Sequence, residues 1–201
     1  RALFTDPTLF ERELRAIFEG TWLYVCHESQ MRQPGDWFTT HMGRQPVVIV
    51  RGQDGTVRGF INACAHRGAM LCRTRKGNNK FFTCPYHGWV YGNDGRNVQI
   101  KNFSTGAYPP AFEAQSHDLT ALPRIESYRD FVFASLNPHV PTLAQHLGDA
   151  RLFIDLLVDQ APDGLEVLPG VSSYVNRGNW KLQGENGLDG YHVGTVHANY
   201  V

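Results

Sequence analysis

Two short stretches decide the fold of this chain: Cys64-Ala65-His66-Arg67-Gly68 and Cys84-Pro85-Tyr86-His87-Gly88-Trp89. Each stretch contributes one cysteine and one histidine, and 17 residues separate the two groups, giving C-x-H and C-x2-H. A glycine shortly after each histidine permits the sharp backbone turn that a metal-binding loop tip needs. The pattern therefore predicts two parallel loops that present four metal ligands: Cys64, His66, Cys84 and His87.

The order of these ligands distinguishes between two kinds of metal site. A zinc ion accepts its ligands in any order, and zinc fingers usually pair Cys with Cys and His with His along the chain. A Rieske-type [2Fe–2S] cluster instead needs two thiolates on one iron and two imidazoles on the other. Two loops that each give one ligand to each iron meet that need. We therefore favour the cluster over a zinc site or unconnected Cys and His in a β core.

The segment around both loops has the pattern of an all-β domain. Strands are predicted for 47–50, 56–61, 89–91, 98–100 and 131–133. Turn residues at 53–55 and 93–95 join two pairs of these segments as hairpins. Asn137-Pro138 marks a boundary, so we divide the chain into a lead-in segment 1–36, a cluster domain 37–137 and a third part 138–201.

Helical patterns flank the β region on both sides. Asp6-Pro7 has the form of an N-cap followed by proline at the first helical position. Apolar residues continue at helical spacing to Gly20, which predicts a short helix with one buried face. Residues 143–158 are predicted to form a second helix, and residues 171–175 a strand. Residues 180–197 are predicted to form a third helix, which is loosened by its glycines. The fold class expected from these elements is α+β.

The last predicted helix carries a second group of ionisable residues. Asn186, Asp189 and His192 are spaced three apart, so they would share one stripe of a helix. His192 and His197 are five apart, about 140° around a regular helix, and converge only if the helix breaks between them. Gly194 is placed to allow that break. Two histidines with one carboxylate form the facial triad of non-haem Fe(II) oxygenases; the alternative is two incidental histidines.

Bulk composition excludes several classes of protein. The formal net charge of +0 gives no general attraction to nucleic acid or to an anionic membrane. No apolar run approaches the ~20 residues of a membrane span, and the N-terminus lacks a signal-peptide pattern. The 4 cysteines are too few for a disulfide scaffold, so we expect a reducing cytoplasm. The start at Arg1 and the stop after the polar cluster suggest a fragment of a longer chain.

Together the two constellations resemble the large (α) subunit of Rieske non-haem iron aromatic-ring-hydroxylating oxygenases. The shared pattern is C-x-H and C-x2-H followed by N-x2-D-x2-H-x4-H. Tyr86 and Ala69 stand where respiratory-chain Rieske proteins carry two disulfide-bonded cysteines, so the loops are similar to the oxygenase type. Cys26 and Cys72 are then buried thiols. The segments that look closest to the benzoate, toluate, anthranilate and 2-halobenzoate 1,2-dioxygenase branch are 17–22, 27–30, 42–46 and 164–168.

The resemblance implies a fold and a set of residue roles. The fold would be an all-β Rieske domain followed by the start of an α+β helix-grip (START-like) catalytic domain. His192 and His197 would bind a mononuclear Fe(II), and Asn186 would lie beside it as a weak or indirect ligand. Asp189 would bridge by hydrogen bonding to His87 of a neighbouring subunit. The third iron ligand would be a later carboxylate outside these 201 residues.

The resemblance also implies an activity and partners. The chain would belong to a terminal oxygenase that cis-dihydroxylates an aromatic carboxylate of the benzoate type with O₂. A small β subunit (in an α3β3 assembly), neighbouring α subunits and an NADH-dependent reductase would complete the system. A Rieske monooxygenase or demethylase shares both motifs and stays an alternative. A simple Rieske electron carrier is a weaker one, because Asp189, His192 and His197 would have no use there.

Overall fold

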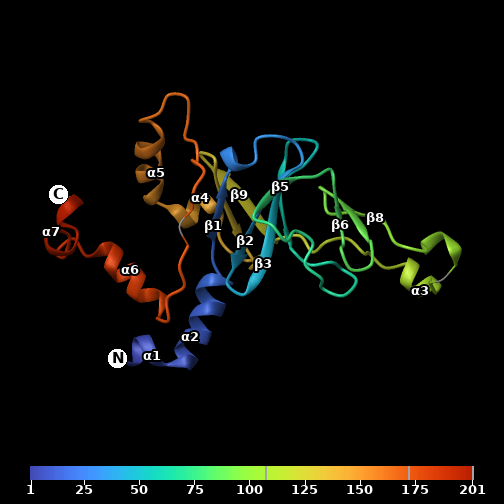
Figure 1. The fold of residues 1–201 in the computed structure, drawn as a ribbon, viewed down its shortest axis with the longest axis horizontal. Coiled ribbons are helices and arrows are strands. Elements are labelled where there is room, and N and C mark those ends of the chain that lie inside the picture. Colours follow the sequence, from blue (N-terminus) through green and yellow to red (C-terminus); the bar gives the residue numbers. More distant parts are fainter. Residues whose placement is uncertain (107, 172, 201) are drawn as a thin grey trace. The chain divides into compact units, whose positions relative to one another are not determined.

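The computed structural model describes residues 1–106, 108–171 and 173–200, with the side chain of residue 200 excepted. The chain separates into two compact units, one made of Arg1–Glu13 with Pro169–Val201 and the other of Leu14–Leu168. The larger unit contains the strands, and the described residues of the smaller one form helices and connections (Figure 1). The predicted α+β class is confirmed, whereas the three predicted domain boundaries and the helix-grip domain stay predictions.

In the described residues, ten strands form three antiparallel sheets. The first has the order β1-β10-β9 and consists of β1 (Leu23–His27), β10 (Phe131–Ser135) and β9 (Arg124–Tyr128). The second has the order β4-β3-β2-β5, with β4 (Val57–Ile61), β3 (Gln45–Arg51), β2 (Asp36–Met42) and β5 (Lys76–Asn78). The third has the order β6-β7-β8, with β6 (Phe81–Thr83), β7 (Val90–Gly92) and β8 (Asn97–Gln99). The strands predicted at 47–50, 56–61, 89–91, 98–100 and 131–133 and both predicted hairpins are therefore confirmed.

Strand β3 lies at the centre of the larger unit and is buried on both faces. Val48 and Val50 belong to a core cluster that also contains the two loop cysteines. Val47 and Ile49 point the other way, into a cluster shared with the sheet of β1, β9 and β10. Because both faces are covered, the strand is apolar without alternation. Each of these side chains contributes roughly 1.5–3 kcal/mol through burial.

The first predicted helix exists but differs in its packing. Asp6 Oδ1 accepts the N–H of Thr8 at 2.8 Å and of Leu9 at 3.3 Å, so it caps α2 (Pro7–Glu13) as predicted. A short helix, α1 (Ala2–Thr5), precedes it, and a π-helical turn, Leu14–Phe18, follows it. The predicted buried face is wrong, because Phe10 and Ile17 are both exposed. The wider π turn breaks the 3.6-residue periodicity on which that face depended.

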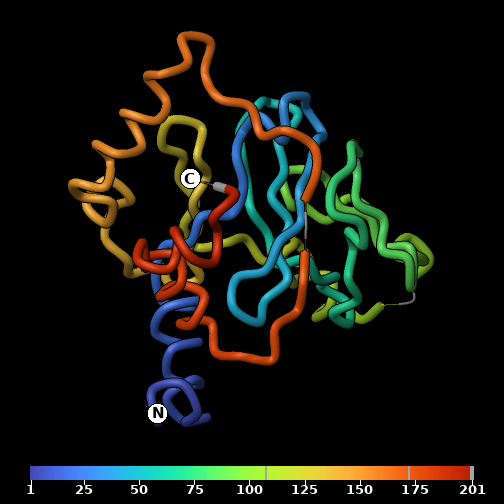
Figure 2. The backbone as a smooth tube through the Cα atoms, turned by 60° about the vertical axis from the view of Figure 1, so that its left-hand side comes forward, coloured from blue at the N-terminus to red at the C-terminus, as the bar shows by residue number. Residues whose placement is uncertain are grey.

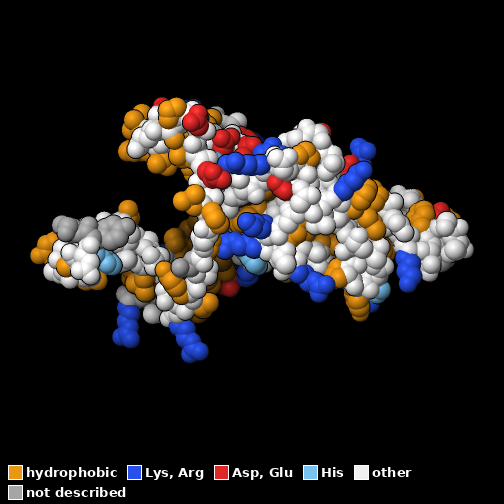
Figure 3. Space-filling view, turned by 45° about the horizontal axis from the view of Figure 1, so that its top comes forward, with side chains coloured by type: hydrophobic (Ala, Val, Ile, Leu, Met, Phe, Trp, Pro, Cys, Tyr) orange, Lys and Arg blue, Asp and Glu red, His pale blue; other side chains and the backbone are white. Residues whose placement is uncertain are grey.

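The later elements correct two further predictions. The helix expected over 143–158 is two helices, α4 (Leu143–Leu147) and α5 (Ala150–Val158), because Gly148 adopts a φ of 48° between them. Apolar side chains of α5 are left on the surface, as Figure 3 shows, including Phe153 and Leu157. No strand forms at 171 or 173–175, where Figure 2 follows an extended trace; residue 172 lies outside the described residues.

The remaining helices are short. They are α3 (Pro110–Glu113), α6 (Trp180–Leu188) and α7 (Val193–Val196). The helix predicted over 180–197 is thus two helices with a break between them. No helix in the described part of the chain is both long and apolar enough to cross a bilayer.

A buried carboxylate ties the smaller unit together. Glu13, at the end of α2, accepts two hydrogen bonds from Lys181 Nζ at 2.6 and 2.7 Å. The same carboxylate accepts the indole N–H of Trp180 at 3.0 Å. Hydrogen bonding from Lys181 lowers the pKa of Glu13. The first turn of α6 is therefore fixed to α2 by a charge-assisted contact, and Asn179 caps the helix with a 3.1 Å bond to the N–H of Lys181.

We expect Glu13→Gln to loosen α6 without disturbing the sheets. The substitution removes the charge that Lys181 faces, so amide hydrogen exchange should accelerate several-fold over 180–188 and stay unchanged in β3. Because the pKa of Glu13 is lowered, the wild-type protection should disappear only as the pH falls through that lowered value. Arg96→Gln breaks an exposed 3.7 Å ion pair and serves as control. Equal rates of amide hydrogen exchange over 180–188 in the two variants would contradict the role of Glu13 in holding α6.

Candidate metal centres

The two loops have nearly the same backbone geometry. In each, the N–H of the cysteine donates to the carbonyl five residues later, at 2.8 Å for Cys64 and 2.7 Å for Cys84. The carbonyl of each cysteine accepts the N–H of the glycine four residues later, at 2.8 Å from Gly68 and 3.0 Å from Gly88. Both glycines have a φ of 71°, a region that favours glycine. The predicted sharp turns are present.

The four predicted ligands form two separate pairs. Cys64 and Cys84 are free thiols with only 3% and 2% of their surface exposed. His66 and His87 are more accessible, and their ring centres lie 4.7 Å apart at an interplanar angle of 67°. A ring centre lies about 3.2 Å from a metal bound to its nitrogen, so two imidazoles sharing one ion stand about 4.5–5.3 Å apart. The histidine spacing fits that range.

The separation of thiols from imidazoles bears on the choice between zinc and a [2Fe–2S] cluster. A structural zinc site gathers four ligands around one ion. Among the described residues, no group of three or more His, Cys, Asp or Glu side chains could hold a single metal ion. A Rieske cluster asks for only two protein ligands on each iron. Two thiols and two imidazoles in separate pairs therefore fit a [2Fe–2S] cluster.

Tyr91, in β7, contacts the cysteine pair and was not found from the sequence. Its hydroxyl lies 3.1 Å from Cys64 Sγ and accepts the N–H of Ala65 at 3.1 Å. Burial raises the pKa of Tyr91, so the phenol keeps its proton and can donate to a thiolate. Burial also lowers the pKa of His66, with His87 adding to the effect, which favours the neutral imidazole that metal binding requires.

The two other cysteines are buried thiols, as predicted. Cys26 packs in the cluster around Val47 and Ile49, and burial raises its pKa to about 12. Burial also raises the pKa of Cys72 to about 12. Neither forms a disulfide. Both thiols therefore stay protonated and unreactive at neutral pH.

The second constellation lies at the break between α6 and α7. Asp189 follows the last residue of α6 with an extended backbone (φ −82°, ψ 105°). His192 stands just before α7 and His197 just after it. The structure thus brings the histidines together, with ring centres 5.2 Å apart, within the range for two ligands of one ion. The predicted break at Gly194 is wrong, because Gly194 lies inside α7 and the chain leaves the helix before His192.

Asp189 orients the first of these histidines. Its Oδ2 lies 3.0 Å from His192 Nδ1, and its Oδ1 accepts the N–H of Tyr191 at 2.8 Å. The Tyr191 N–H, followed by His192, lowers the pKa of Asp189, so the carboxylate is ionised. An ionised carboxylate fixes the proton on Nδ1 and leaves Nε2 free for a metal. Asn186 lies within α6, so the predicted single stripe with Asp189 and His192 is wrong.

We expect Tyr91→Phe to lower the reduction potential of the bound cluster. A hydrogen bond to sulfur stabilises the more negative, reduced state. Its loss should cost about 1 kcal/mol, equivalent to about 40 mV for a one-electron couple. Redox titration followed by EPR measures this shift. Tyr128→Phe, which removes a hydroxyl bonded to Asp155 rather than to a cysteine, is the control. An equal potential in both variants would argue against the contact.

Comparisons with known proteins also point to a [2Fe–2S] cluster. The family model for the Rieske [2Fe-2S] domain matches residues 21–123. The chain is 52% identical to toluate 1,2-dioxygenase subunit alpha of Pseudomonas putida over 100% of its own length and 44% of that protein. It is 52% identical to anthranilate 1,2-dioxygenase large subunit of Acinetobacter baylyi, covering 100% and 42%.

A solved structure supports the same relationship. Naphthalene 1,2-dioxygenase from Rhodococcus sp., bound to indole, superposes with a TM-score of 0.91 at 33% identity, covering 98% of this chain and 45% of that one. The chain therefore spans less than half the length of each of these proteins. The matched residues include both loops and all four predicted cluster ligands. The chain belongs to the Rieske [2Fe–2S] domain family.

Proposed function

We propose that this chain serves in the large subunit of a terminal oxygenase that cis-dihydroxylates a benzoate-type aromatic carboxylate with O₂. The observation that carries the proposal is the joint presence of the two constellations in one chain. The similarity to toluate and anthranilate dioxygenases extends beyond the Rieske loops, since it covers 100% of this chain. A simple electron carrier would not need the histidine pair near the end of the chain.

The residues divide into two metal-holding groups. Cys64 and Cys84 would hold one iron of the cluster, and His66 and His87 the other. When bound, the cluster supplies single electrons, and a mononuclear Fe(II) supplies the binding and reduction of O₂. His197 and the free Nε2 of His192 would be two protein ligands of that Fe(II). Ring centres 5.2 Å apart suit two ligands of one ion.

The Asp189 carboxylate fixes the position of the His192 ring proton and can accept one more hydrogen bond. One oxygen accepts the Nδ1 proton of His192, which fixes the tautomer that leaves Nε2 to the metal. The carboxylate stays half exposed, so its remaining lone pairs can accept the imidazole N–H of His87 from a neighbouring copy. Such a bridge would join the cluster of one subunit to the mononuclear site of the next. Asn186 would lie beside that site as an indirect ligand.

The partners follow from the same proposal. An NADH-dependent reductase would deliver electrons, a small β subunit would complete an α3β3 assembly, and the complex would work in the cytoplasm. The two relatives are themselves described as subunits. The role would belong to aromatic hydrocarbon catabolism, including benzoate degradation.

The decisive experiment is product analysis of the complete enzyme with its reductase. Substituted benzoates should give cis-diols that retain both atoms of ¹⁸O₂. A product carrying one labelled oxygen, or a dealkylated product, would identify a monooxygenase instead. Reduction of the cluster without any consumption of O₂ on any benzoate would identify an electron carrier.

We expect His192→Ala and His197→Ala to abolish oxygenation and leave the cluster intact. Loss of a direct ligand should lower product formation by more than about 100-fold, beyond the 10–100-fold cost of losing a group that orients a ligand. Mononuclear iron content should fall, while the cluster absorption and EPR signal persist. His146→Ala, in α4, should behave as wild type. Retained turnover in either ligand variant would remove the proposed iron site.

Asp189→Asn should separate cluster reduction from product formation. The cluster should still be reduced by dithionite, but single-turnover product formation should fall about 10–100-fold, because the variant cannot fix the His192 tautomer as a carboxylate does. Glu185→Gln removes a neighbouring exposed acid of α6 and serves as the matched control. A normal single-turnover rate in Asp189→Asn would contradict the proposed role.

A further inference from the structure

Contacts with other rings surround the two histidines of the loops in the described residues. Metal-bound histidines nearly always donate the N–H of their second ring nitrogen to a carboxylate, a carbonyl or water, and the bond fixes the plane of the ring. In the described part of the chain, the side-chain interactions seen at the imidazoles of His66 and His87 are contacts between rings. Ring contacts are therefore what this chain itself supplies to orient the two imidazoles, and the outer nitrogen of His87 stays open to Asp189 of a neighbouring copy.

Aromatic rings contact both histidines, but the two contacts differ. Trp89 stacks on His66 with ring centres 4.7 Å apart and planes only 12° from parallel. Trp89 is buried, with 2% of its surface exposed. Tyr86 lies against His87 at 3.9 Å but is tilted by 39° and remains 63% exposed. The buried indole of Trp89 thus supports the His66 ring, whereas the Tyr86 ring beside His87 is exposed to solvent.

A second set of rings holds Trp89 in place. The edges of Phe112 and His117 contact the indole, with ring centres 6.1 and 5.5 Å away. These two rings stack on one another at 4.1 Å, and His117 Nε2 lies 2.9 Å from the carbonyl oxygen of Phe112. Tyr108 stacks on the far face of this pair, 4.4 Å from Phe112. The indole therefore has little freedom to turn.

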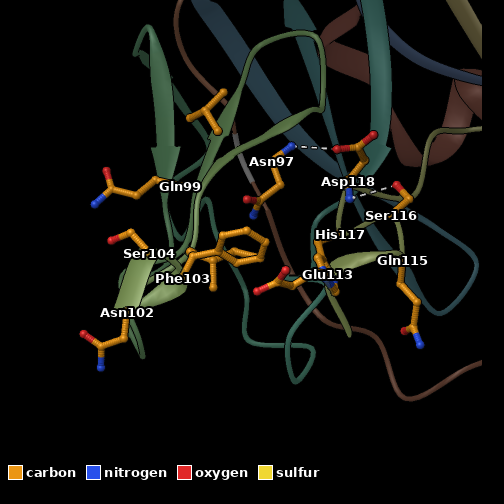
Figure 4. A pocket seen from close by; sticks show the side chains of 12 residues that line it. Asn97, Gln99, Asn102, Phe103, Ser104, Glu113, Gln115, Ser116, His117 and Asp118 are labelled. Carbon is orange, nitrogen blue, oxygen red and sulfur yellow. Dashed lines mark hydrogen bonds between the residues drawn. The ribbon is translucent and has the colours of Figure 1, made fainter. Parts of the chain in front are cut away.

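The outer edge of this aromatic stack borders a surface cavity of about 610 Å³. Figure 4 shows His117 and Phe103 among the side chains around it, with Asp118 held by its own hydrogen bonds. Phe103 contacts Tyr108 at 6.1 Å. Phe103 is therefore an aromatic side chain of the same cavity that can be changed without touching Trp89.

We propose that Trp89 is the positioning residue for His66 and acts through its stacked indole. This rests on the proposed cluster ligation by His66. The indole plane fixes the plane of the imidazole and so the direction of its nitrogen lone pair. It also keeps water from one face of the ligand. His87 lacks such a support and keeps its outer edge open.

The water-excluding role predicts the sign of an electrochemical change. Two ferric ions, two sulfides, two thiolates and two neutral imidazoles sum to a neutral cluster, which becomes singly negative on reduction. Water stabilises the charged state more than an indole does. Removing the indole should therefore favour the reduced cluster and raise the reduction potential. The freed His66 ring should also sample several orientations.

Three variants of the intact protein test this proposal. Trp89→Leu removes the indole, and Trp89→Phe keeps a smaller aromatic ring. Phe112→Leu leaves the indole in place but removes one of the rings that contact it. Phe103→Leu is the control. The reduction potential is measured at one fixed pH, and pulsed EPR of the reduced cluster resolves the nitrogen couplings of the two histidines.

We expect the reduction potential of the cluster to rise most in Trp89→Leu and less in Trp89→Phe and Phe112→Leu. It should not change in Phe103→Leu. One of the two histidine couplings should broaden in the same order, while the other stays sharp. Wild-type potential and couplings in variants that hold the cluster would overturn the role of Trp89. If Trp89→Leu does not retain the cluster, the reduction potential and the histidine couplings of Phe112→Leu provide the test. A wild-type protein without histidine couplings would instead overturn the proposed ligation itself.

Discussion

The segregation of two thiols from two imidazoles is the constraint on which the rest of the structure depends. Cys64 and Cys84 are buried in the core shared with β3, whereas His66 and His87 stand at the loop tips. Matching backbone hydrogen bonds and a positive φ at Gly68 and Gly88 give both loops the same shape. A cluster held in this way has its thiolate iron inside the protein and its imidazole iron near the surface. Electrons can then enter or leave through an exposed histidine edge.

The second centre depends on a departure from regular helix. Five residues separate His192 from His197, a spacing that a continuous helix would spread around its surface. The chain resolves this by leaving α6 at Asp189 and placing the histidines on either side of α7. His192 keeps helical backbone angles (φ −76°, ψ −14°), whereas His197 departs from them (φ −115°, ψ 39°), and the two ring centres lie 5.2 Å apart. The same break gives Asp189 its contact with His192. Glu13 and Lys181 anchor the start of the helix that leads into this break.

The sequence predicted five of the described strands, both hairpins and the sharp turns of the two loops, because these depend on local patterns. Val47 to Val50 could only be a buried strand, and the glycines near His66 and His87 could only serve sharp turns. Contacts between residues that are far apart in the sequence could not be predicted from it. Nothing in the pattern around Tyr91 indicates a bond to Cys64, and the break at Gly148 competes with an uninterrupted apolar periodicity. The site of the break before His192 also escaped prediction, since Gly194 and Gly190 are equally permissive in sequence.

The assignment of two cysteines to one iron and two histidines to the other is tested most directly by pulsed EPR of the reduced protein labelled with ¹⁵N-histidine. Iron and sulfide analysis should give two of each per cluster. The spectrum should show two inequivalent histidine nitrogens coupled to the reduced iron, and His66→Cys should remove one of them. A spectrum without histidine coupling, or a single zinc ion in place of the irons, would contradict the account.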